Sequence, residues 1–256
     1  MLGVMILAAK ACGLLRDALI TASYGTGTSA AIAYETASKL PVTLFDLVIG
    51  GVVTAAFVPV YNELLVRDGK EKALSFAQSY TRFILIVTSV LAGIGIAFAS
   101  PLVRLMAPGL DASTHALATG LTRLLFPMIV FTGLAFTFVG YLQSMGEFRV
   151  PAVISLVANG IMVAYLLTLN RFFGIVGLAV AMLLGWTAQA LVQLPSLCRL
   201  GYRYRPFAPL RTPELKKAIV TTVPILIGTW VSPVCNLINT RLASSIDGGR
   251  GLTVLG

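Results

Sequence analysis

The chain alternates long apolar stretches with short polar segments along its whole length. An apolar run of about 20 residues is long enough to cross the hydrocarbon core of a membrane as an α-helix. Seven runs of at least about this length occur, and each predicts a membrane-spanning helix. Their approximate ranges are 2–22, 30–65, 73–99, 116–144, 150–169, 174–198 and 218–243. The pattern therefore predicts an all-α fold, a polytopic membrane bundle of about seven helices.

Polar and helix-breaking residues refine these predicted spans. The second run is too long for one straight span, and Pro41, Gly50-Gly51 and Pro59 interrupt it. Proline and glycine commonly cause kinks, so we expect a tilted or kinked helix there. The loop after the third run contains Ala107-Pro108-Gly109 and leaves room for a short interfacial helix. The fifth and sixth runs meet in a close hairpin around Asn170-Arg171.

Composition agrees with a membrane protein. The chain is 57% hydrophobic and only 11% charged, whereas soluble domains carry about 25% charged residues. The formal net charge of +9 is also typical of nucleic-acid-binding proteins. Here, however, the basic residues cluster in short loops between apolar runs, so we expect no nucleic-acid partner. We expect the first run not to be a cleaved signal peptide, because it lacks a basic n-region and charged residues interrupt it.

Residues for catalysis or metal binding are scarce. The single histidine, His115, lies in a polar loop, and Cys12, Cys198 and Cys235 have no metal or disulfide spacing. The sequence has no glycine-rich phosphate loop followed by Lys-Ser/Thr, no zinc motif and no nucleophile elbow. We therefore expect neither an enzyme nor a bound metal or cofactor.

The loops predict an orientation in the membrane. Ten basic residues fall on one side of the predicted bundle and three on the other. The ten are Arg67, Lys70, Lys72, Arg149, Arg199, Arg203, Arg205, Arg211, Lys216 and Lys217, and the three are Arg104, Arg171 and Arg250. Because cytoplasmic loops carry the excess of Lys and Arg, this bias places the N-terminus in the cytoplasm.

The first two runs also contain charged residues inside their predicted spans. These residues are Lys10, Arg16, Asp17, Glu35, Lys39 and Asp46. An ionised side chain costs at least about 2.5–3.5 kcal/mol at the centre of a bilayer, even on the insertion scale that gives the lowest values. Such residues must be paired or must face a wet cavity. They are therefore the first candidates for a functional surface.

Helical geometry groups these charges into two stripes. At about 100° per residue, the charges of each run fall on one face of its helix, and Arg16 flanks the first stripe. Glu35 and Lys39 are spaced i,i+4 in the order that favours an ion pair. We expect the two stripes to face each other across a hydrated cavity, to which the seventh run adds polar residues. Those residues are Asn236, Asn239 and Arg241. Ion pairs that only hold helices in register remain the alternative for each single residue.

Eight short motifs occur in the same order as in one family of membrane transporters. They are Leu14-Leu15-Arg16-Asp17-Ala18, Tyr24-Gly25-Thr26-Gly27, Lys39-Leu40-Pro41, Ala56-Phe57-Val58-Pro59-Val60-Tyr61, Ala107-Pro108-Gly109, Phe126-Pro127, Gln193-Leu194-Pro195 and Ile238-Asn239-Thr240. The ordered set spans nearly the whole chain. On these motifs the chain resembles the N-terminal part of the MurJ/MviN family of lipid II flippases, within the multidrug/oligosaccharidyl-lipid/polysaccharide exporter superfamily.

The resemblance implies a domain organisation. Members of the family have two six-helix lobes and two extra helices. Residues 1–198 would form the first lobe, 199–217 a basic cytoplasmic linker, and 218–256 the first helix of a truncated second lobe. The chain stops soon after the seventh run without a polar tail, which favours a fragment of a longer transporter. A natural seven-span protein remains possible.

The resemblance also implies an activity. The family moves the undecaprenyl-pyrophosphate-linked peptidoglycan precursor, lipid II, between the leaflets of the bacterial inner membrane by alternating access. Its partners would be the lipid-linked precursor, membrane lipids, and a coupling ion or the membrane potential. The residues expected to bind substrate are Arg16, Lys10, Lys39 and Arg241. The residues expected to form ion pairs or to couple transport to an ion are Asp17, Glu35 and Asp46.

This sequence departs from the family pattern in the second run. Enterobacterial members carry an Arg-Arg pair where this chain has Phe45-Asp46, and the early acidic residue is replaced by Glu35 nearby. The departures keep two alternatives open within the superfamily: a flippase for another polyprenyl-linked polysaccharide, and a cation-coupled drug exporter. A third alternative, of another class, is a non-transporting membrane scaffold or an inactive fragment.

Overall fold

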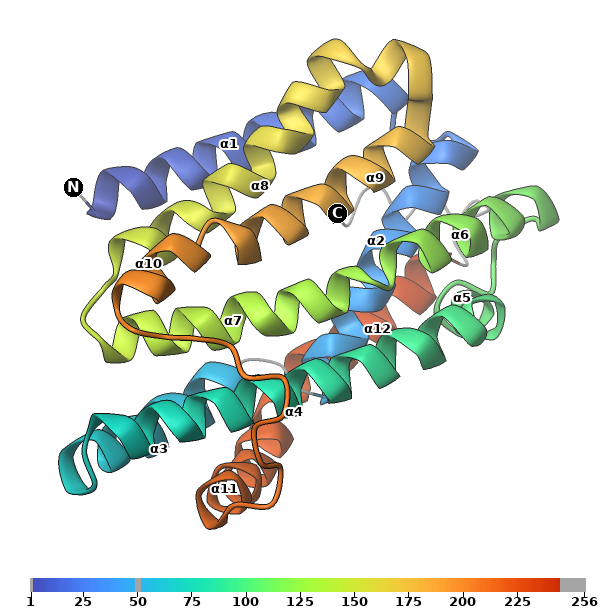
Figure 1. Cartoon of the computed structure of the whole chain (residues 1–256). Helices are drawn as coiled ribbons and strands as arrows, with labels where there is room; N and C mark the ends of the chain where they lie inside the picture. The colour runs from blue at the N-terminus through green and yellow to red at the C-terminus, as the bar shows by residue number, and fades with distance from the viewer. Residues whose placement is uncertain (1, 49–51, 245–256) are drawn as a thin grey trace.

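The structure, a computed structural model, describes residues 2–48 and 52–244, and these residues form helices and connecting loops (Figure 1). The helices are α1 (Leu2–Tyr24), α2 (Ser29–Val48), α3 (Val52–Arg67), α4 (Lys70–Ala97), α5 (Ala99–Met106), α6 (Ala112–Leu125), α7 (Met128–Ser144), α8 (Arg149–Thr168), α9 (Asn170–Leu191), α10 (Leu194–Arg199), α11 (Pro213–Thr229) and α12 (Val231–Ser244). The all-helical prediction is confirmed for this part of the chain.

Two predicted spans are each broken into two helices, and a third contains two helices. The second run contains α2 and α3, with Pro41 and Pro59 inside these helices. Gly50-Gly51 falls between the two helices, outside the described residues. The fourth run forms α6 and α7, which are bent by 41° at Phe126-Pro127. The seventh run forms α11 and α12, which meet at Trp230. The predicted interruption of the second run at Gly50-Gly51 therefore stays a prediction.

The remaining predictions for helices agree more closely. The first, third and fifth runs correspond to α1, α4 and α8, and α5 is the short helix expected after the third run. The hairpin at Asn170-Arg171 is followed by Gly174, whose φ of 53° and ψ of −145° interrupt the helical backbone. Asp111 begins α6 by accepting hydrogen bonds from the backbone N–H groups of Ser113 and Thr114. Hydrogen bonds from these two residues hold the pKa of Asp111 well below its usual range.

The helices pack in an arrangement that leaves charged faces outside the main core. α1 packs on α8, α8 on α9, α2 on α6, and α7 on both α3 and α4. Tyr61 of α3 and Tyr141 of α7 are fully buried, with ring centroids 5.4 Å apart. Leu40 and Phe45 of α2 join the same core. The opposite, charged face of α2 therefore lies outside it.

Some of the helices can cross a membrane by length and apolar composition alone. Among the described residues these are Lys70–Ala97, Arg149–Thr168 and Asn170–Arg199, and the bent pair α6–α7 is a fourth if it forms one span. α1 and α2 are 23 and 20 residues long, but each carries three charged side chains. The count of about seven spans stays a prediction.

Candidate functional site

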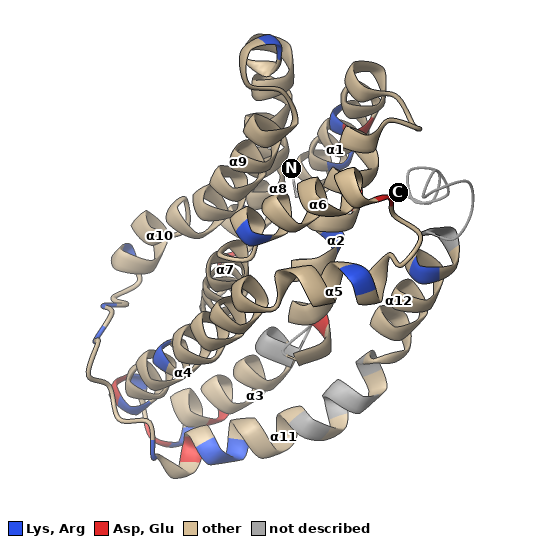
Figure 2. Cartoon of the chain, turned by 90° about the vertical axis from the view of Figure 1, so that its right-hand side faces the viewer, with Lys and Arg blue, Asp and Glu red and all other residues tan. Residues whose placement is uncertain are grey.

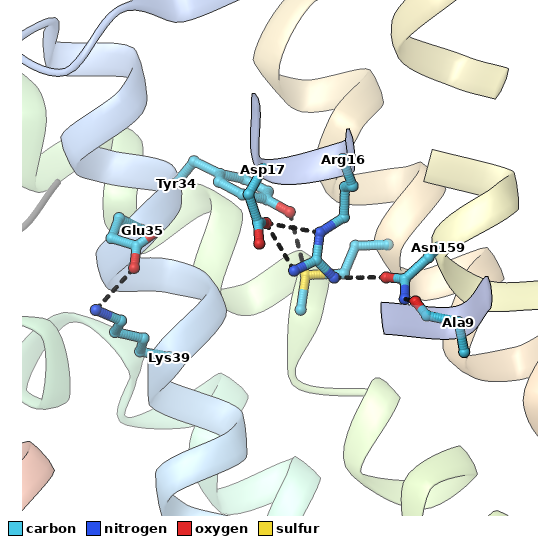
Figure 3. Close-up of polar contacts among 8 residues, drawn as sticks. Ala9, Arg16, Asp17, Tyr34, Glu35, Lys39 and Asn159 are labelled. Carbon is cyan, nitrogen blue, oxygen red and sulfur yellow. Dashed lines mark hydrogen bonds and ion pairs between the residues drawn. The ribbon is translucent and has the colours of Figure 1, made fainter. Parts of the chain in front are cut away.

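The charged pair of α1 is tied to α8 by an asparagine. Arg16 donates hydrogen bonds from Nε and Nη2 to Oδ1 of Asp17, at 2.9 and 2.7 Å (Figure 3). Its Nη1 donates to Oδ1 of Asn159 on α8 at 2.7 Å. Asn159 also lies close to Gly13 of α1, since a Cβ at position 13 would be in ordinary van der Waals contact with Nδ2 of Asn159, at 3.4 Å. Arg16 is therefore held between its own helix and α8.

The charged pair of α2 is formed by two residues of the same helix. Lys39 Nζ lies 2.7 Å from Oε1 of Glu35, one helical turn away. Both side chains are partly buried, with 30% and 23% of their surface exposed. The i,i+4 ion pair expected from the sequence is therefore present (Figure 3).

The two helices border a common cavity. A space of about 220 Å³ is lined by Arg16 and Asp17 of α1 and by Tyr34 and Glu35 of α2. Met182 of α9 closes one wall and accepts a hydrogen bond from the Tyr34 hydroxyl at 3.4 Å. The expectation that charges of α1 and α2 share a cavity is confirmed for these residues.

A second cavity adjoins the first and continues along α2. It measures about 330 Å³, and Lys39 and Asp46 of α2 face Asn236 and Asn239 of α12 across it. Ser38 and Met182 line both cavities. We call the two cavities together the polar groove.

The polar groove carries more carboxylates than cations. Its lining includes Arg16 and Lys39 against Asp17, Glu35 and Asp46. Arg16 is bonded to Asp17 and Lys39 to Glu35. Asp46 is the carboxylate of the lining for which the described residues provide no ion pair. The charged side chains of the lining that the structure describes therefore sum to a formal charge of −1.

Lys10 and Arg241 do not line the polar groove. Lys10 faces a separate cavity of about 510 Å³ between α1 and α8, which Asn159 also borders. Asp17 lines the first cavity and not this one, although Lys10 and Asp17 lie two turns apart on one helical face. Arg241 lies exposed in the last turn of α12. Lys10 and Asp17, expected on one stripe, thus line different cavities.

The sequence reasoning missed Asn159. Its only signal is a single amide in the otherwise apolar run 150–169. Polar side chains within such runs often hydrogen-bond to neighbouring helices. The partner, however, depends on how α1 crosses α8, which the pattern of the chain does not contain.

The helical arrangement places the chain in a known fold class. It has the fold seen in solved structures of MATE and MurJ membrane proteins. A MATE structure in complex with MaD3S superposes with a TM-score of 0.75 at 18% identity, covering 99% of this chain and 58% of that one. A lipid II flippase MurJ in an inward closed conformation superposes with a TM-score of 0.81 at 21% identity, covering 97% of this chain and 51% of that one.

Sequence similarity identifies the family within this class. The model of the lipid II flippase MurJ family matches residues 21–254, so the chain belongs to that family. The lipid II flippase MurJ of Burkholderia cenocepacia is 30% identical over 251 residues, covering 95% of this chain and 48% of that protein. A probable lipid II flippase MurJ of Bdellovibrio bacteriovorus is 28% identical over 250 residues, covering 95% and 47%. The chain spans about half the length of these relatives.

Proposed function

We propose that this chain is the N-terminal part of a transporter that flips lipid II from the inner to the outer leaflet of the bacterial inner membrane by alternating access. In this proposal residues 1–198 form a six-helix lobe and 199–217 a cytoplasmic linker. Residues 218–256 begin the second lobe, and the N-terminus is cytoplasmic. Membership of the flippase family supports the substrate. The single observation that carries the proposal is Arg16, held by Asp17 and Asn159 at the edge of a cavity.

Arg16 is suited to bind the pyrophosphate of the substrate. A guanidinium has five N–H donors, and it pairs well with phosphate oxygens. The described hydrogen bonds of Arg16 use three of the five. Two donors are left for a ligand, while Asp17 and Asn159 keep the guanidinium in place. We assign Asp17 to positioning Arg16.

The other proposed contacts follow from the same chemistry. Lys39 would exchange its bond with Glu35 for one with the substrate, and Glu35 would take part in coupling. Lys10 and Arg241, which lie outside the polar groove, would meet the substrate at another stage of the cycle. The groove would bind and release the lipid without breaking any bond in it, so we expect no enzymatic activity.

Asp46 is the proposed residue for coupling. The described residues give Asp46 no ion pair, and an unpaired carboxylate inside the membrane is costly. We therefore expect Asp46 to bind a cation or a proton. Alternating access would then be driven by an ion gradient or by the membrane potential.

The excess of carboxylates in the groove also favours a second candidate function: export of a cationic compound, or of a different polyprenyl-linked polysaccharide, by the same alternating access.

Complementation tests the proposal. Cells depleted of their own lipid II flippase would express the complete reading frame that contains this chain, either unchanged or as Arg16→Ala. We expect the unchanged protein to restore growth and Arg16→Ala to fail at equal membrane abundance. Arg104→Ala is the matched control, because Arg104 is an exposed arginine outside the groove. Equal growth with Arg16→Ala would show that Arg16 does not bind the headgroup. No growth with the unchanged protein would contradict the lipid II proposal.

A further inference from the structure

The segment that joins α10 to α11 has an unusual composition. Residues 199–212 include Arg199, Arg203, Arg205 and Arg211 and contain no acidic residue. The ion pairs of the described residues involve none of these four arginines. The segment therefore presents uncompensated positive charge. Figure 2 shows it as the outer connection between α10 and α11, with basic residues along it.

This segment is fastened to α4. The Tyr202 hydroxyl donates to Oγ1 of Thr81 at 2.8 Å, and the Tyr202 side chain is buried. Nε2 of Gln78 donates to the backbone oxygen of Arg203 at 2.8 Å. These contacts fix the start of the segment 203–208 against the helix.

A third bond fixes the end of the same segment. Nη1 of Arg82 donates to the backbone oxygen of Ala208 at 2.6 Å, and Ala208 is buried. With both ends held on α4, residues 204–207 project from the surface in a defined position. They differ in this respect from a flexible linker.

The projecting residues are aromatic and basic. Phe207 is 90% exposed and Tyr204 is 46% exposed. Arg203, Arg205 and Arg211 are exposed around them. An aromatic ring left in water is unfavourable, whereas the interface between lipid headgroups and acyl chains accommodates both its apolar body and a polar tip. Arginines that only set the orientation of the protein in the membrane would not require exposed aromatic neighbours.

We propose that this segment binds anionic phospholipid headgroups of the leaflet on its side of the membrane. Tyr204 and Phe207 insert at the level of the headgroups, and Arg203, Arg205 and Arg211 bind their phosphates. Arginine matches a phosphate with two parallel N–H donors. Because the segment is attached to α4 and leads directly into α11, it anchors both helices at the interface. This proposal does not depend on which substrate the protein transports.

A fluorescent label in place of Phe207 tests the proposal. In the complete protein, Cys12, Cys198 and Cys235 are replaced by Ser, and Phe207→Cys is labelled with an environment-sensitive nitrobenzoxadiazole. The protein is reconstituted in vesicles of phosphatidylcholine with and without phosphatidylglycerol. Quenching is measured with nitroxide on the upper acyl chain of either lipid. We expect stronger quenching by nitroxide-phosphatidylglycerol than by nitroxide-phosphatidylcholine.

The arginines are tested with the combined variant Arg203→Gln, Arg205→Gln and Arg211→Gln. Each basic residue near an anionic membrane surface raises the association constant with that surface by up to about fivefold. Removing three arginines should therefore abolish the preference of the label for phosphatidylglycerol. Phe172→Cys is the control site, because Phe172 is an exposed phenylalanine beside the single Arg171. Labels there should show much less preference for phosphatidylglycerol.

Two results would overturn the proposal. A label at position 207 that neither lipid quenches would place the segment in water or under another protein segment. Equal quenching by both lipids, unchanged by the three substitutions, would show that the arginines do not bind the headgroups.

Discussion

At the scale of single residues, Arg16 illustrates how charge is accommodated in an apolar helix. The sequence shows that Arg16 and Asp17 are adjacent, and the structure joins them through two hydrogen bonds. The third bond, to Asn159, connects residues 143 positions apart. It fixes the direction of the guanidinium toward the cavity, which the adjacent aspartate alone does not do.

Asn159→Ala should weaken substrate binding without removing it. The substitution deletes the acceptor of Arg16 Nη1 but leaves the two bonds to Asp17. A hydrogen bond to a charged group contributes about 1.5–3 kcal/mol, so we expect roughly a tenfold or larger rise in the lipid II concentration needed for half-maximal flipping. Flipping by purified protein in proteoliposomes measures this. Ser155→Ala, one turn away on α8, should be neutral, and an equal effect of both variants would contradict the assignment.

Asp46→Asn should increase the affinity of the groove for a pyrophosphate lipid. It removes the carboxylate for which the described lining supplies no ion pair. Repulsion between the carboxylate and a pyrophosphate charge about 10 Å away costs between 1 and 2 kcal/mol at an effective dielectric of about 20. This corresponds to roughly a tenfold change in affinity for the lipid. Binding of lipid II to protein in lipid nanodiscs measures the change. Thr43→Val changes the same cavity without changing its charge, and should leave affinity unchanged. Weaker binding by Asp46→Asn would instead favour a cationic ligand at this carboxylate.

At the scale of helices, the apolar runs located most elements, but they did not locate all the breaks. The run 116–144 is continuous in hydropathy, yet the chain bends by 41° at Phe126-Pro127. Pro127 cannot donate a backbone hydrogen bond, which permits the bend. The buried Phe126 ring occupies the space that Gly95 leaves on α4. The bend therefore depends both on Pro127 and on the packing of Phe126 against Gly95 of α4.

Gly95→Ala should destabilise the bundle at this bend. A Cβ at position 95 would lie 2.1 Å from the ring of Phe126, which is fully buried. Overpacking of this kind costs about 1–3 kcal/mol, so we expect the thermal transition in detergent to fall by several degrees.

Gly93→Ala provides the control on the same helix. Apart from its chain neighbours and the backbone of its own helix, no atom of the described residues lies within 4 Å of a Cβ at position 93. Its thermal transition should stay the same or rise, since alanine favours helix over glycine. If the two variants melted alike, the contact between Gly95 and Phe126 would not be tight.

At the scale of the whole molecule, α11 and α12 close one side of the described bundle. Nζ of Lys217 on α11 lies 2.5 Å from Oε2 of Glu63 on α3. The indole N–H of Trp230 donates a hydrogen bond to the backbone oxygen of Leu47 at 2.7 Å. Figure 2 shows that charged residues gather where α3, α4 and α11 meet. The division of the chain at 198/199 and 217/218 stays a prediction.

Glu63→Gln should loosen the first turns of α11. It removes the charge that pairs with Lys217, but both side chains are about half exposed, so we expect a modest change. Amide hydrogen exchange in residues 213–220 should speed up a few-fold at neutral pH. Glu71→Gln is the control, because Glu71 is an exposed carboxylate on neighbouring α4 outside the ion pairs of the described residues. Unchanged exchange in Glu63→Gln would mean that apolar packing alone holds α11.

The sequence by itself determined the helical membrane class, the approximate positions of the helices, the family and most of the charged candidates. These follow from hydropathy, periodicity and local motifs, which are properties of neighbouring residues. Only the tertiary structure decided that Arg16, Asp17 and Glu35 share one cavity and that Lys10 lies in another. It also decided that Asn159 supports Arg16 and that Asp46 faces α12. Helical periodicity specifies the face on which a charge lies, but the crossing of helices determines what that face meets.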